Sequence, residues 1–482
     1  MLDASTLRAI DSSTLVGFLR ERRWFGEKGQ PSLRARIAEV IPIPGDGQQW
    51  AVVRVELALE DGTVASYQLA LSVREREMSR VHAPAAVLAT VESDVASGLL
   101  FDAIDDPGFR ARLARALSKG EGFSGEGASL TSERVGTGAP PLDGASRVVG
   151  GEQSNSSIIF GDHAIFKLFR RLEAGESPDV EIARYLTAHT SFRNTPELYA
   201  TLVLAHGTEH AVAGMLSRFI PGAMDGWAHA LGRARAFVHG DTDARNDPFA
   251  PEAERLGVVT AALHTALAIP TNDPAFAPRD AAAADIARWA GATRKRVEEG
   301  FELLDRLATR LDARSRPLAL AVAGRRIDAF EHLDAIVHAL GGPQAAGVLS
   351  RHHGDYHLGQ VLRTSDDWMI IDFEGEPARP LAERRALSSA ARDVAGMLRS
   401  FAYAAATAAA HDDADRERAA RWEAMAREAF LRGYGGTRST PLIQMFELEK
   451  LFYELAYELN NRPTWVWIPL VGIQTMLASR AD

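Results

Sequence analysis

The chain has 482 residues, 46% of them hydrophobic, and this length predicts two to four packed units. Its 54 Lys and Arg residues and 64 Asp and Glu residues give a formal net charge of −10, which argues against sequence-independent binding of nucleic acid. The lack of cysteine excludes disulfides, thiolate zinc sites and cysteine nucleophiles.

The first residues, MLDASTLRAIDSSTL, lack the basic start and the apolar run of a secretory signal. The most apolar later stretch, residues 400–410, is alanine-rich and too short to cross about 30 Å of hydrocarbon. We therefore expect a cytoplasmic protein with neither a membrane nor a nucleic acid as its partner.

Residues 1–90 are expected to form a small α+β cap domain that supplies no catalytic group. A helical pattern covers residues 13–23, and strand-like alternation follows in residues 49–57 and 65–71. Asp61-Gly62 predicts the turn between the two strands.

Residues 91–218 are expected to hold an intermediate region and the nucleotide-binding lobe. A helical pattern comes first, and a connector rich in Gly, Ser and Pro ends at residues 136–141. Gly161-Asp162 lies between two apolar runs and predicts a β-hairpin, and Ser177-Pro178 can start the helix that follows. Residues 219–482, rich in Ala, Leu, Arg and Glu, are expected to form a mostly helical lobe that carries the catalytic loop and the acceptor site.

The residues between 350 and 380 carry the strongest chemical signal. Phosphoryl transfer needs a carboxylate that aligns the attacking hydroxyl and further oxygens that hold Mg²⁺ on the phosphates. Asp355, Gln360 and Asp372 supply such a set. The spacing from Asp355 to Gln360 matches the Asp-to-Asn spacing in the catalytic loop of protein kinases, and Asp372-Phe373 matches the start of their metal-binding motif.

A kinase also needs a cation for the phosphates, and Lys167 lies inside an otherwise apolar strand. Glu181, in the following helix, lies where the ion-pair partner of such a lysine is expected, although a solvent-facing lysine is the alternative. Upstream, residues 150–157 can cover phosphates with N–H and hydroxyl donors, although such runs are also found as plain turns. The nucleotide-binding candidates in this run are Gln153, Ser154, Asn155 and Ser156.

Residues 446–461 have one apolar face typical of a helix, and Tyr453, Tyr457 and Asn461 form a second face. A tyrosine stripe is usually half-buried packing, but aromatic rings with amide and hydroxyl partners also suit a sugar. The further candidates for contacts with sugar hydroxyls are His357, Glu374, Glu376 and Arg379, and a structural role for His357 stays equally open. Arg392-Asp393 is expected to support the catalytic loop through backbone hydrogen bonds.

Together, seven segments resemble bacterial maltokinases, which look like aminoglycoside phosphotransferases with an extra N-terminal cap. They are WFGEKG (24–29), QSNS (153–156), FKLFRR (166–171), PGAMDGW (221–227), HGDYHLGQVLR (353–363), IIDFEGEPARPL (370–381) and RDVAGMLRSF (392–401). The resemblance runs from the first helix to near the C-terminus. It implies an α+β, bilobal, protein-kinase-like fold with an N-terminal α+β cap and a mostly helical C-terminal lobe.

The resemblance also implies ATP-dependent conversion of maltose to maltose 1-phosphate, which feeds α-glucan (glycogen) synthesis, with ATP and Mg²⁺ as cofactors. Sugar and ATP would be the partners, with a possible association with enzymes of trehalose or α-glucan metabolism. Asp355 becomes the catalytic base, and Gln360 and Asp372 become the magnesium ligands. Residues 215–219, which precede the Pro-Gly turn at 221–222, would form the hinge between the two lobes. The backbone of this segment, which contains Ser217 and Phe219, would contact adenine. The C-terminal segment that contains Trp465 also resembles maltokinases, so Trp465 is a sugar-binding candidate.

Other interpretations stay open. Glucosamine kinases share the same core, and a kinase for glucosamine or an aminoglycoside would aim carboxylates such as Glu374 and Glu376 at an ammonium. A pseudokinase is disfavoured because Asp355, Lys167 and Asp372 are all present. An anomeric hydroxyl is acidic enough for a carboxylate base, which makes a 1-phosphate product reasonable without excluding a 6-phosphate. ATP and GTP are not distinguished.

Overall fold

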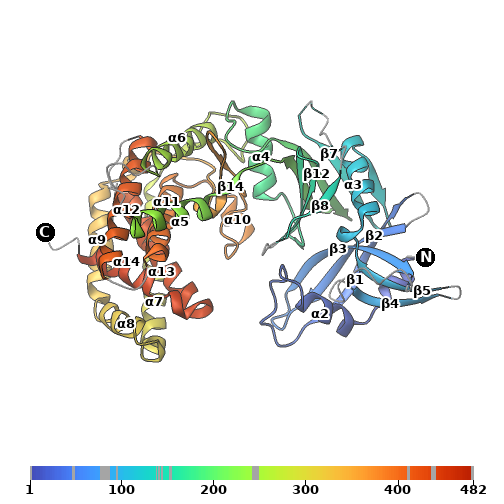
Figure 1. Cartoon of the computed structure of the whole chain (residues 1–482), viewed down its shortest axis with the longest axis horizontal. Helices are drawn as coiled ribbons and strands as arrows, with labels where there is room; N and C mark the ends of the chain where they lie inside the picture. Colours follow the sequence, from blue (N-terminus) through green and yellow to red (C-terminus); the bar gives the residue numbers. More distant parts are fainter. Residues whose placement is uncertain are drawn as a thin grey trace. The chain divides into compact units, whose positions relative to one another are not determined.

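In the computed structural model, the described residues are 3–45, 49–75, 87–93, 96–136, 138, 142, 145–150, 155–240, 249–409, 413–435 and 441–478. The chain divides into two compact units, Met1–Pro221 and Gly222–Asp482, and each is described by itself (Figure 1). The first unit is rich in strands and the second in helices, as expected for an α+β chain. Among the described residues, no helix combines the length and apolar character needed to span a bilayer.

Two antiparallel sheets form the first unit, with strand orders β1-β2-β3-β5-β4 and β6-β7-β12-β13-β10-β9-β8. Their strands are β1 (Arg34–Pro44), β2 (Gln49–Ala58), β3 (Val64–Glu75), β4 (Val87–Ser93), β5 (Ala96–Asp102), β6 (Gly122–Ser124), β7 (Ala128–Arg134), β8 (Ser146–Val148), β9 (Ser156–Phe160), β10 (Ala164–Leu168), β12 (Leu198–His206) and β13 (Glu209–Arg218). The short strand β11 (Arg171–Leu172) pairs with β3. The helices are α1 (Ala4–Arg8), α2 (Ser12–Arg20), η3 (Ala103–Asp105), α3 (Pro107–Lys119) and α4 (Pro178–His189).

Local sequence signals are confirmed in several of these elements. The hairpin predicted at Gly161-Asp162 joins β9 to β10, and Lys167 lies in β10. The turn at Asp61-Gly62 joins β2 to β3, and Gly62 adopts a positive φ of 83° that suits glycine. Helix α4 starts at Pro178 directly after its N-cap Ser177, in the position where the missing N–H of proline costs no hydrogen bond.

The helical expectation for the residues directly after 91 is wrong. Strands β4 and β5 occupy this region, and β5 pairs with both β3 and β4. Leu100 and Phe101 are buried there, so ladder hydrogen bonds and apolar burial outweigh local helical preference. The helix comes later, as α3. The first sheet thus continues to Asp102, whereas the predicted connector at residues 136–141 lies mostly outside the described residues.

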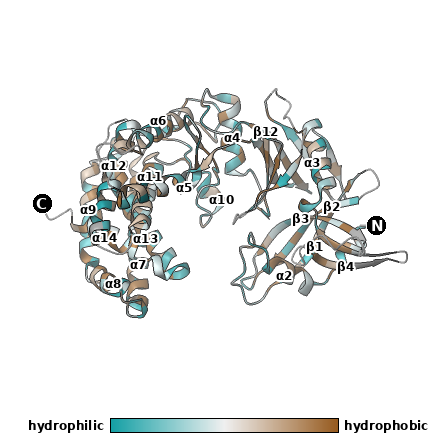
Figure 2. Cartoon of the chain, viewed as in Figure 1, coloured by the Kyte–Doolittle hydropathy of each residue, from teal (hydrophilic) through white to brown (hydrophobic). Residues whose placement is uncertain are grey.

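One hydrophobic cluster of the first unit joins its two sheets. Trp50 and Ile43 from the first sheet belong to the same buried cluster as Phe160 and Phe166 from the second, and Phe109 of α3 is part of it. Hydrophobic positions follow the strands of both sheets in Figure 2. Because burial of apolar surface is the main stabilising contribution to folding, the two sheets stabilise each other.

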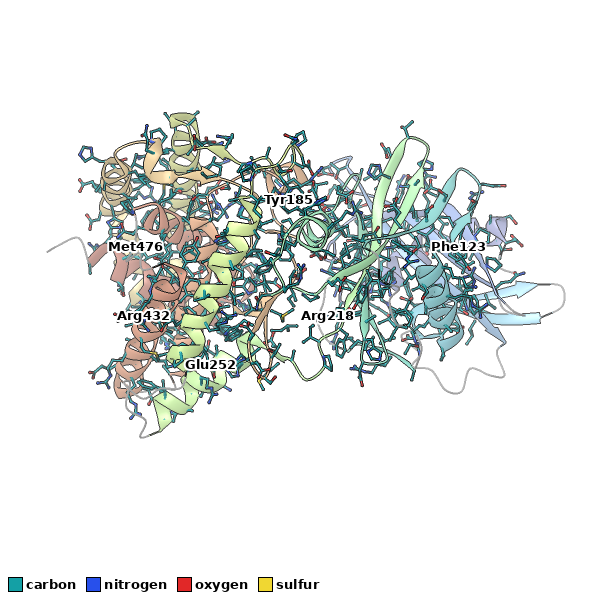
Figure 3. All side chains as sticks on the ribbon, turned by 90° about the horizontal axis from the view of Figure 1, so that it is seen from above. Phe123, Tyr185, Arg218, Glu252, Arg432 and Met476 are labelled. Atoms are coloured by element: carbon teal, nitrogen blue, oxygen red, sulfur yellow. The ribbon has the colours of Figure 1, made fainter. Side chains whose placement is uncertain are left out.

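The second unit is mostly helical and contains a small sheet, β14-β17-β18, and a strand pair, β15-β16. Its helices are α5 (Gly226–His239), α6 (Phe249–Leu267), α7 (Ala283–Leu307), η5 (Ala308–Arg310), α8 (Ser315–Ala323), α9 (Arg326–Leu340), η6 (Pro343–Ala346), η7 (Leu358–Gln360), α10 (Leu381–Arg384), α11 (Ala391–Ala408), α12 (Asp413–Tyr434), α13 (Pro441–Asn461), η8 (Pro463–Trp465) and α14 (Trp467–Ala478). Its strands are β14 (Met224–Asp225), β15 (Arg279–Asp280), β16 (Val348–Leu349), β17 (Val361–Arg363) and β18 (Trp368–Ile370). Helices α6 and α12, marked by Glu252 and Arg432 in Figure 3, pack against each other, with Arg432 Nη2 2.8 Å from Glu254 Oε2.

Helix α11 holds the loop that precedes η7. The buried Asp393 carboxylate accepts hydrogen bonds from the backbone N–H groups of His353 at 2.7 Å and Gly354 at 2.9 Å. His264 Nε2 lies 3.0 Å from the same carboxylate. Burial opposes ionisation of Asp393, but the hydrogen bond from His264 and the nearby histidines lower its pKa below the ordinary value. The predicted backbone support of this loop by Asp393 is confirmed.

We predict that Asp393→Ala lowers the free energy of unfolding by about 2–4 kcal/mol, because the buried N–H of His353, the partly buried N–H of Gly354 and the buried His264 ring all lose their acceptor. Urea unfolding measures this change. Asp366→Ala, at an exposed position, is the control and should stay within about 0.5 kcal/mol of wild type. Equal stability of the two variants would contradict a supporting role for Asp393.

Candidate active site

Two loops of the second unit approach each other closely at Asp355 and Asp372. Gly354 has a φ of 85°, and a Cβ atom placed there would lie 3.2 Å from Gly375 Cα, so the contact requires glycine. His353 Nε2 lies 2.9 Å from the carbonyl oxygen of Ile371, which fixes one loop to the other. Asp372 has a φ of 68°, the one positive φ outside glycine among the described residues. Such strained backbone is commonly found at functional sites.

The Asp355 carboxylate forms an ion pair with Lys450 of α13. Lys450 Nζ lies 3.1 Å from Asp355 Oδ1, and His357 Nε2 lies 3.8 Å from Asp355 Oδ2. Burial opposes ionisation of Asp355, but the positive charge of Lys450 brings its pKa below the ordinary aspartate value. Burial alone would lower the pKa of Lys450, but the Asp355 and Glu376 carboxylates raise it. Asp355 is therefore held as a carboxylate.

Sequence reasoning missed Lys450. It is 95 residues from Asp355 along the chain, and only packing of α13 against the loop brings the two together. Its ammonium also lies 4.8 Å from the ring centre of Tyr453. The one signal in the sequence was a lysine three residues before the tyrosine stripe, which by itself is typical of a solvated helix face.

A pocket of 510 Å³ opens beside Asp355. Five predicted site residues line it: Asp355, His357, Tyr453, Tyr457 and Trp465. The other lining residues are Trp227, Gly359, Gly396, Ser400, Tyr403, Lys450, Glu454, Glu458 and Arg462. Its volume and its mixture of aromatic rings with a few polar groups are typical of small-molecule sites.

Each acidic residue of this pocket has a basic partner within the second unit. Besides the Asp355–Lys450 pair, Glu454 Oε2 lies 2.9 Å from Arg399 Nη2, and Glu458 Oε1 lies 2.6 Å from Arg462 Nη2. The Arg462 guanidinium carbon also lies 5.3 Å from the ring centre of Tyr457 and 5.0 Å from that of Trp465. The Arg462 guanidinium therefore holds the rings of Tyr457 and Trp465 in place through cation–π contacts.

Glu376 and Arg379 line a separate cavity of 30 Å³ that also touches Asp355. Arg379 Nε donates to Glu376 Oε2 at 2.9 Å, and Arg379 Nη2 donates to Glu449 Oε1 at 2.8 Å. Burial opposes the charge of Arg379, but these two carboxylates raise its pKa above the ordinary value. Both predicted residues thus take part in an internal charge network.

Glu374 and Asn461, also predicted to bind sugar, do not line the 510 Å³ pocket. Asn461 is exposed, and its Nδ2 donates to the carbonyl oxygen of Tyr457 at 2.9 Å at the end of α13.

A carboxylate oxygen of Glu374 lies within 4.8 Å of a carboxylate oxygen of Asp372. The Gln360 side-chain amide lies 3.2 Å from Asp372 Oδ2 and, with its nitrogen toward that oxygen, donates to it. Asp372 and Glu374 therefore bring together carboxylate oxygens suited to a hard cation, and the Gln360 amide lies beside them.

The phosphate-binding candidates lie in the first unit. Lys167 Nζ lies 3.0 Å from Oδ2 of the buried Asp179, two residues before the predicted partner Glu181. Glu181 is also buried, and both acidic residues belong to the first turn of α4. Asp179 was missed because the expected spacing pointed to Glu181 alone.

The other residues predicted to bind the nucleotide come directly before or at the start of β9 in the chain and around the end of β13. Asn155 and Ser156 are described, whereas Gln153 and Ser154 lie outside the described residues. The buried Ser217 pairs with Ile165 in the second sheet. The Phe219 N–H donates to the carbonyl oxygen of His163 at 2.8 Å, so it is engaged within the first unit.

Comparison with known proteins adds independent findings. The maltokinase N-terminal cap domain family matches residues 18–106, a range that includes strands β1 to β5 of the first sheet. A glucosamine kinase of Streptacidiphilus jiangxiensis is 30% identical over 360 residues, covering 71% of this chain and 76% of the relative. A glucosamine kinase of Mycolicibacterium smegmatis is 30% identical over 344 residues, covering 68% of this chain and 78% of the relative.

A solved glucosamine kinase, in complex with glucosamine, ADP and inorganic phosphate, has a similar fold. Its TM-score is 0.67 at 22% identity, and the match covers 98% of this chain and 99% of that one. The likeness in sequence extends over most of both chains and the likeness in fold over nearly all of them. The chain therefore belongs to the family of capped sugar kinases that includes these bacterial glucosamine kinases.

Proposed function

We propose that this kinase transfers the γ-phosphoryl group of ATP to the anomeric hydroxyl of maltose, giving maltose 1-phosphate and ADP. The observation that carries the proposal is Asp355, paired with Lys450, in a 510 Å³ pocket that Tyr453, Tyr457 and Trp465 also line. A maltose 1-phosphate product would serve cytoplasmic α-glucan (glycogen) synthesis, and association with enzymes of trehalose or α-glucan metabolism would fit that role.

In the proposed reaction, Asp355 accepts a hydrogen bond from the C1 hydroxyl of the sugar and aligns its oxygen with the γ-phosphorus. As the new O–P bond forms and the bond to the ADP oxygen breaks, the hydroxyl proton passes to Asp355. Lys450 keeps the carboxylate ionised before transfer and fixes its orientation. An anomeric hydroxyl is acidic enough that this base needs no raised pKa.

Gln360 and Asp372 would hold Mg²⁺, with Glu374 near enough to contribute an oxygen atom. When bound, the ion would neutralise charge on the phosphates. Lys167, held by Asp179 beside Glu181, would anchor the phosphates as a cation. Asn155 and Ser156, with Gln153 and Ser154, would cover them, and the segment around Ser217 and Phe219 would contact adenine.

Maltose is preferred to an amino sugar for two reasons. The cap family matched in this chain is that of maltokinases. In addition, the pocket carboxylates Asp355, Glu454 and Glu458 are already paired with Lys450, Arg399 and Arg462. An ammonium group loses its hydration on binding and needs a carboxylate that is not already neutralised, whereas a neutral disaccharide needs only hydroxyl partners and flat aromatic surface.

Glucosamine is the second candidate acceptor, because two relatives at 30% identity are named glucosamine kinases. Steady-state kinetics with maltose, glucosamine, glucose and an aminoglycoside as separate acceptors decide between the two candidates. Higher kcat/KM for glucosamine than for maltose would replace maltose as the substrate and leave the kinase assignment standing.

We predict that Asp355→Asn lowers kcat by roughly 10²-fold or more, because general-base assistance is typically worth about 10² to 10⁴. Nucleotide binding, measured by calorimetric titration, should be retained. Asp366→Asn, at an exposed position in the same unit, serves as the control and should leave kcat unchanged. A nearly normal kcat in Asp355→Asn would remove Asp355 from the chemistry.

We predict that Lys450→Met moves the acid limb of the kcat/KM pH profile to higher pH. Asp355 acts as a base only when ionised, so activity falls as the pH drops through its pKa. Burial raises that pKa and Lys450 lowers it, so removal of Lys450 raises the pKa of Asp355, with His357 and His353 left as the groups that oppose burial. The exposed Lys295 provides the control Lys295→Met, for which the limb should not move. An unchanged limb in Lys450→Met would contradict the pairing.

We predict that Tyr457→Ala and Trp465→Ala raise the KM for maltose roughly 5- to 150-fold, as expected when an aromatic contact that the bound sugar would bury, worth about 1–3 kcal/mol, is truncated. The KM for ATP should change little. Phe330→Ala is a matched control and should leave the KM for maltose unchanged. The Phe330 ring centre also lies beside an arginine, 5.3 Å from the guanidinium carbon of Arg294, but Phe330 does not line the pocket. NMR of the product should place the phosphate on C1 of the reducing glucose. Unchanged maltose kinetics in both variants would exclude α13 from the acceptor site.

A further inference from the structure

Arg170 is a buried arginine at the junction of the two sheets of the first unit, with 1% of its surface exposed. It follows β10, the strand that carries Lys167. Its Nη2 donates to Asp102 Oδ2 at 2.6 Å, at the end of the first sheet. Its Nε donates to Ser156 Oγ at 2.8 Å, and its backbone N–H donates to Asn155 Oδ1 at 3.4 Å. One side chain thus binds both the first sheet and the start of β9.

The first sheet also fixes the backbone around Arg170. Gln68 of β3 donates its backbone N–H to the carbonyl oxygen of Arg170 at 2.8 Å. The Gln68 side-chain amide donates to the carbonyl oxygens of Phe169 and Ala213, the second of which lies in β13. Arg170 therefore cannot shift without breaking buried hydrogen bonds, and such bonds are costly to leave unmade.

The third contact of the guanidinium is the ring of Trp24, with 4.9 Å between the guanidinium carbon and the ring centre. Trp24 is itself packed against Tyr67 of β3, with ring centres 5.9 Å apart. Trp24 and Ser156 also border one cavity of 290 Å³. The position of Ser156 thus depends, through Arg170, on an aromatic residue in the domain matched as a cap.

We infer that the cap controls the affinity for ATP by holding the start of β9 through Arg170, and this inference rests on the proposed function. Asn155 and Ser156 end the run that is proposed to cover the phosphates, and Ser157 pairs with Lys167 across β9 and β10. Arg170 is a positioning residue, because it acts on the proposed nucleotide loop through Asn155 and Ser156.

Arginine is required here by geometry. The guanidinium directs separate N–H groups at Asp102 and Ser156 while its flat face lies against Trp24, and a lysine ammonium cannot make all three contacts at once. Arg171, the next residue, provides a control. It is 54% exposed, and its Nη2 lies 3.5 Å from Glu27, another residue of the cap, with no contact to Asn155 or Ser156 among its described interactions.

The test uses the full chain with Arg170→Lys, Ser156→Ala, Trp24→Ala and Arg171→Lys. The first three variants should weaken ATP affinity, measured by titration, about 5- to 30-fold, within the coupling range typical of contacting residues. The KM for the sugar should change less than about 2-fold, a split that general destabilisation would not produce. Combining Trp24→Ala with Ser156→Ala should weaken ATP binding no more than the larger single change, because Trp24 acts on the nucleotide through Arg170 and Ser156. Arg171→Lys should match wild type.

Hydrogen–deuterium exchange separates this inference from the proposed function, because it needs no turnover. Trp24→Ala should increase exchange of the β9 amides while leaving β1 and β2 protected, whatever substrate the enzyme uses. Unchanged exchange of the β9 amides in Trp24→Ala would overturn the inference. So would a loss of ATP affinity in the double variant that equals the product of the two single losses, or a loss in Arg171→Lys as large as that in Arg170→Lys. A wild-type protein that binds ATP but phosphorylates no sugar would overturn the proposed function alone.

Discussion

The arrangement of the candidate active site depends on one buried carboxylate, that of Asp393. It accepts the N–H groups of His353 and Gly354 and so fixes the backbone immediately before Asp355. A loop without regular secondary structure has few internal hydrogen bonds to hold it, so its shape must come from outside contacts. For the loop that contains Asp355, helix α11 supplies this outside contact through Asp393. The close approach of Gly354 to Gly375 then brings the loop after β18 next to the loop of Asp355.

Charge pairing shapes the pocket beside that loop. A buried carboxylate without a partner is expensive, so each acidic residue in the pocket is matched by a basic one from α11, α13 or the segment after α13. The pairing also has a chemical consequence. It leaves Asp355 ionised for proton transfer and leaves little unneutralised negative charge for a cationic substrate, which supports a neutral sugar as the proposed acceptor.

The first unit shows why the cap is more than an appended domain. Its sheet shares a core with the second sheet, and β11, which follows Arg170, is an extra strand paired with β3. A segment that contributes core residues and strand pairing to its neighbour stabilises that neighbour. The contacts of Arg170 extend this dependence to Ser156, at the edge of the proposed nucleotide loop.

The sequence by itself determined the features that local chemistry controls. Glycine turns placed the β9–β10 hairpin, and apolar periodicity placed the helix that carries Tyr453 and Tyr457. The spacing of Asp355, Gln360 and Asp372 singled out the loops that meet in the second unit. Tertiary structure alone decided which charged groups meet. Lys450 reaches Asp355 across 95 residues, and Arg379 turns to Glu449 rather than into the larger pocket. The reason is that a residue pattern encodes neighbours three or four positions apart, whereas the pairing of buried charges is decided by packing between distant elements.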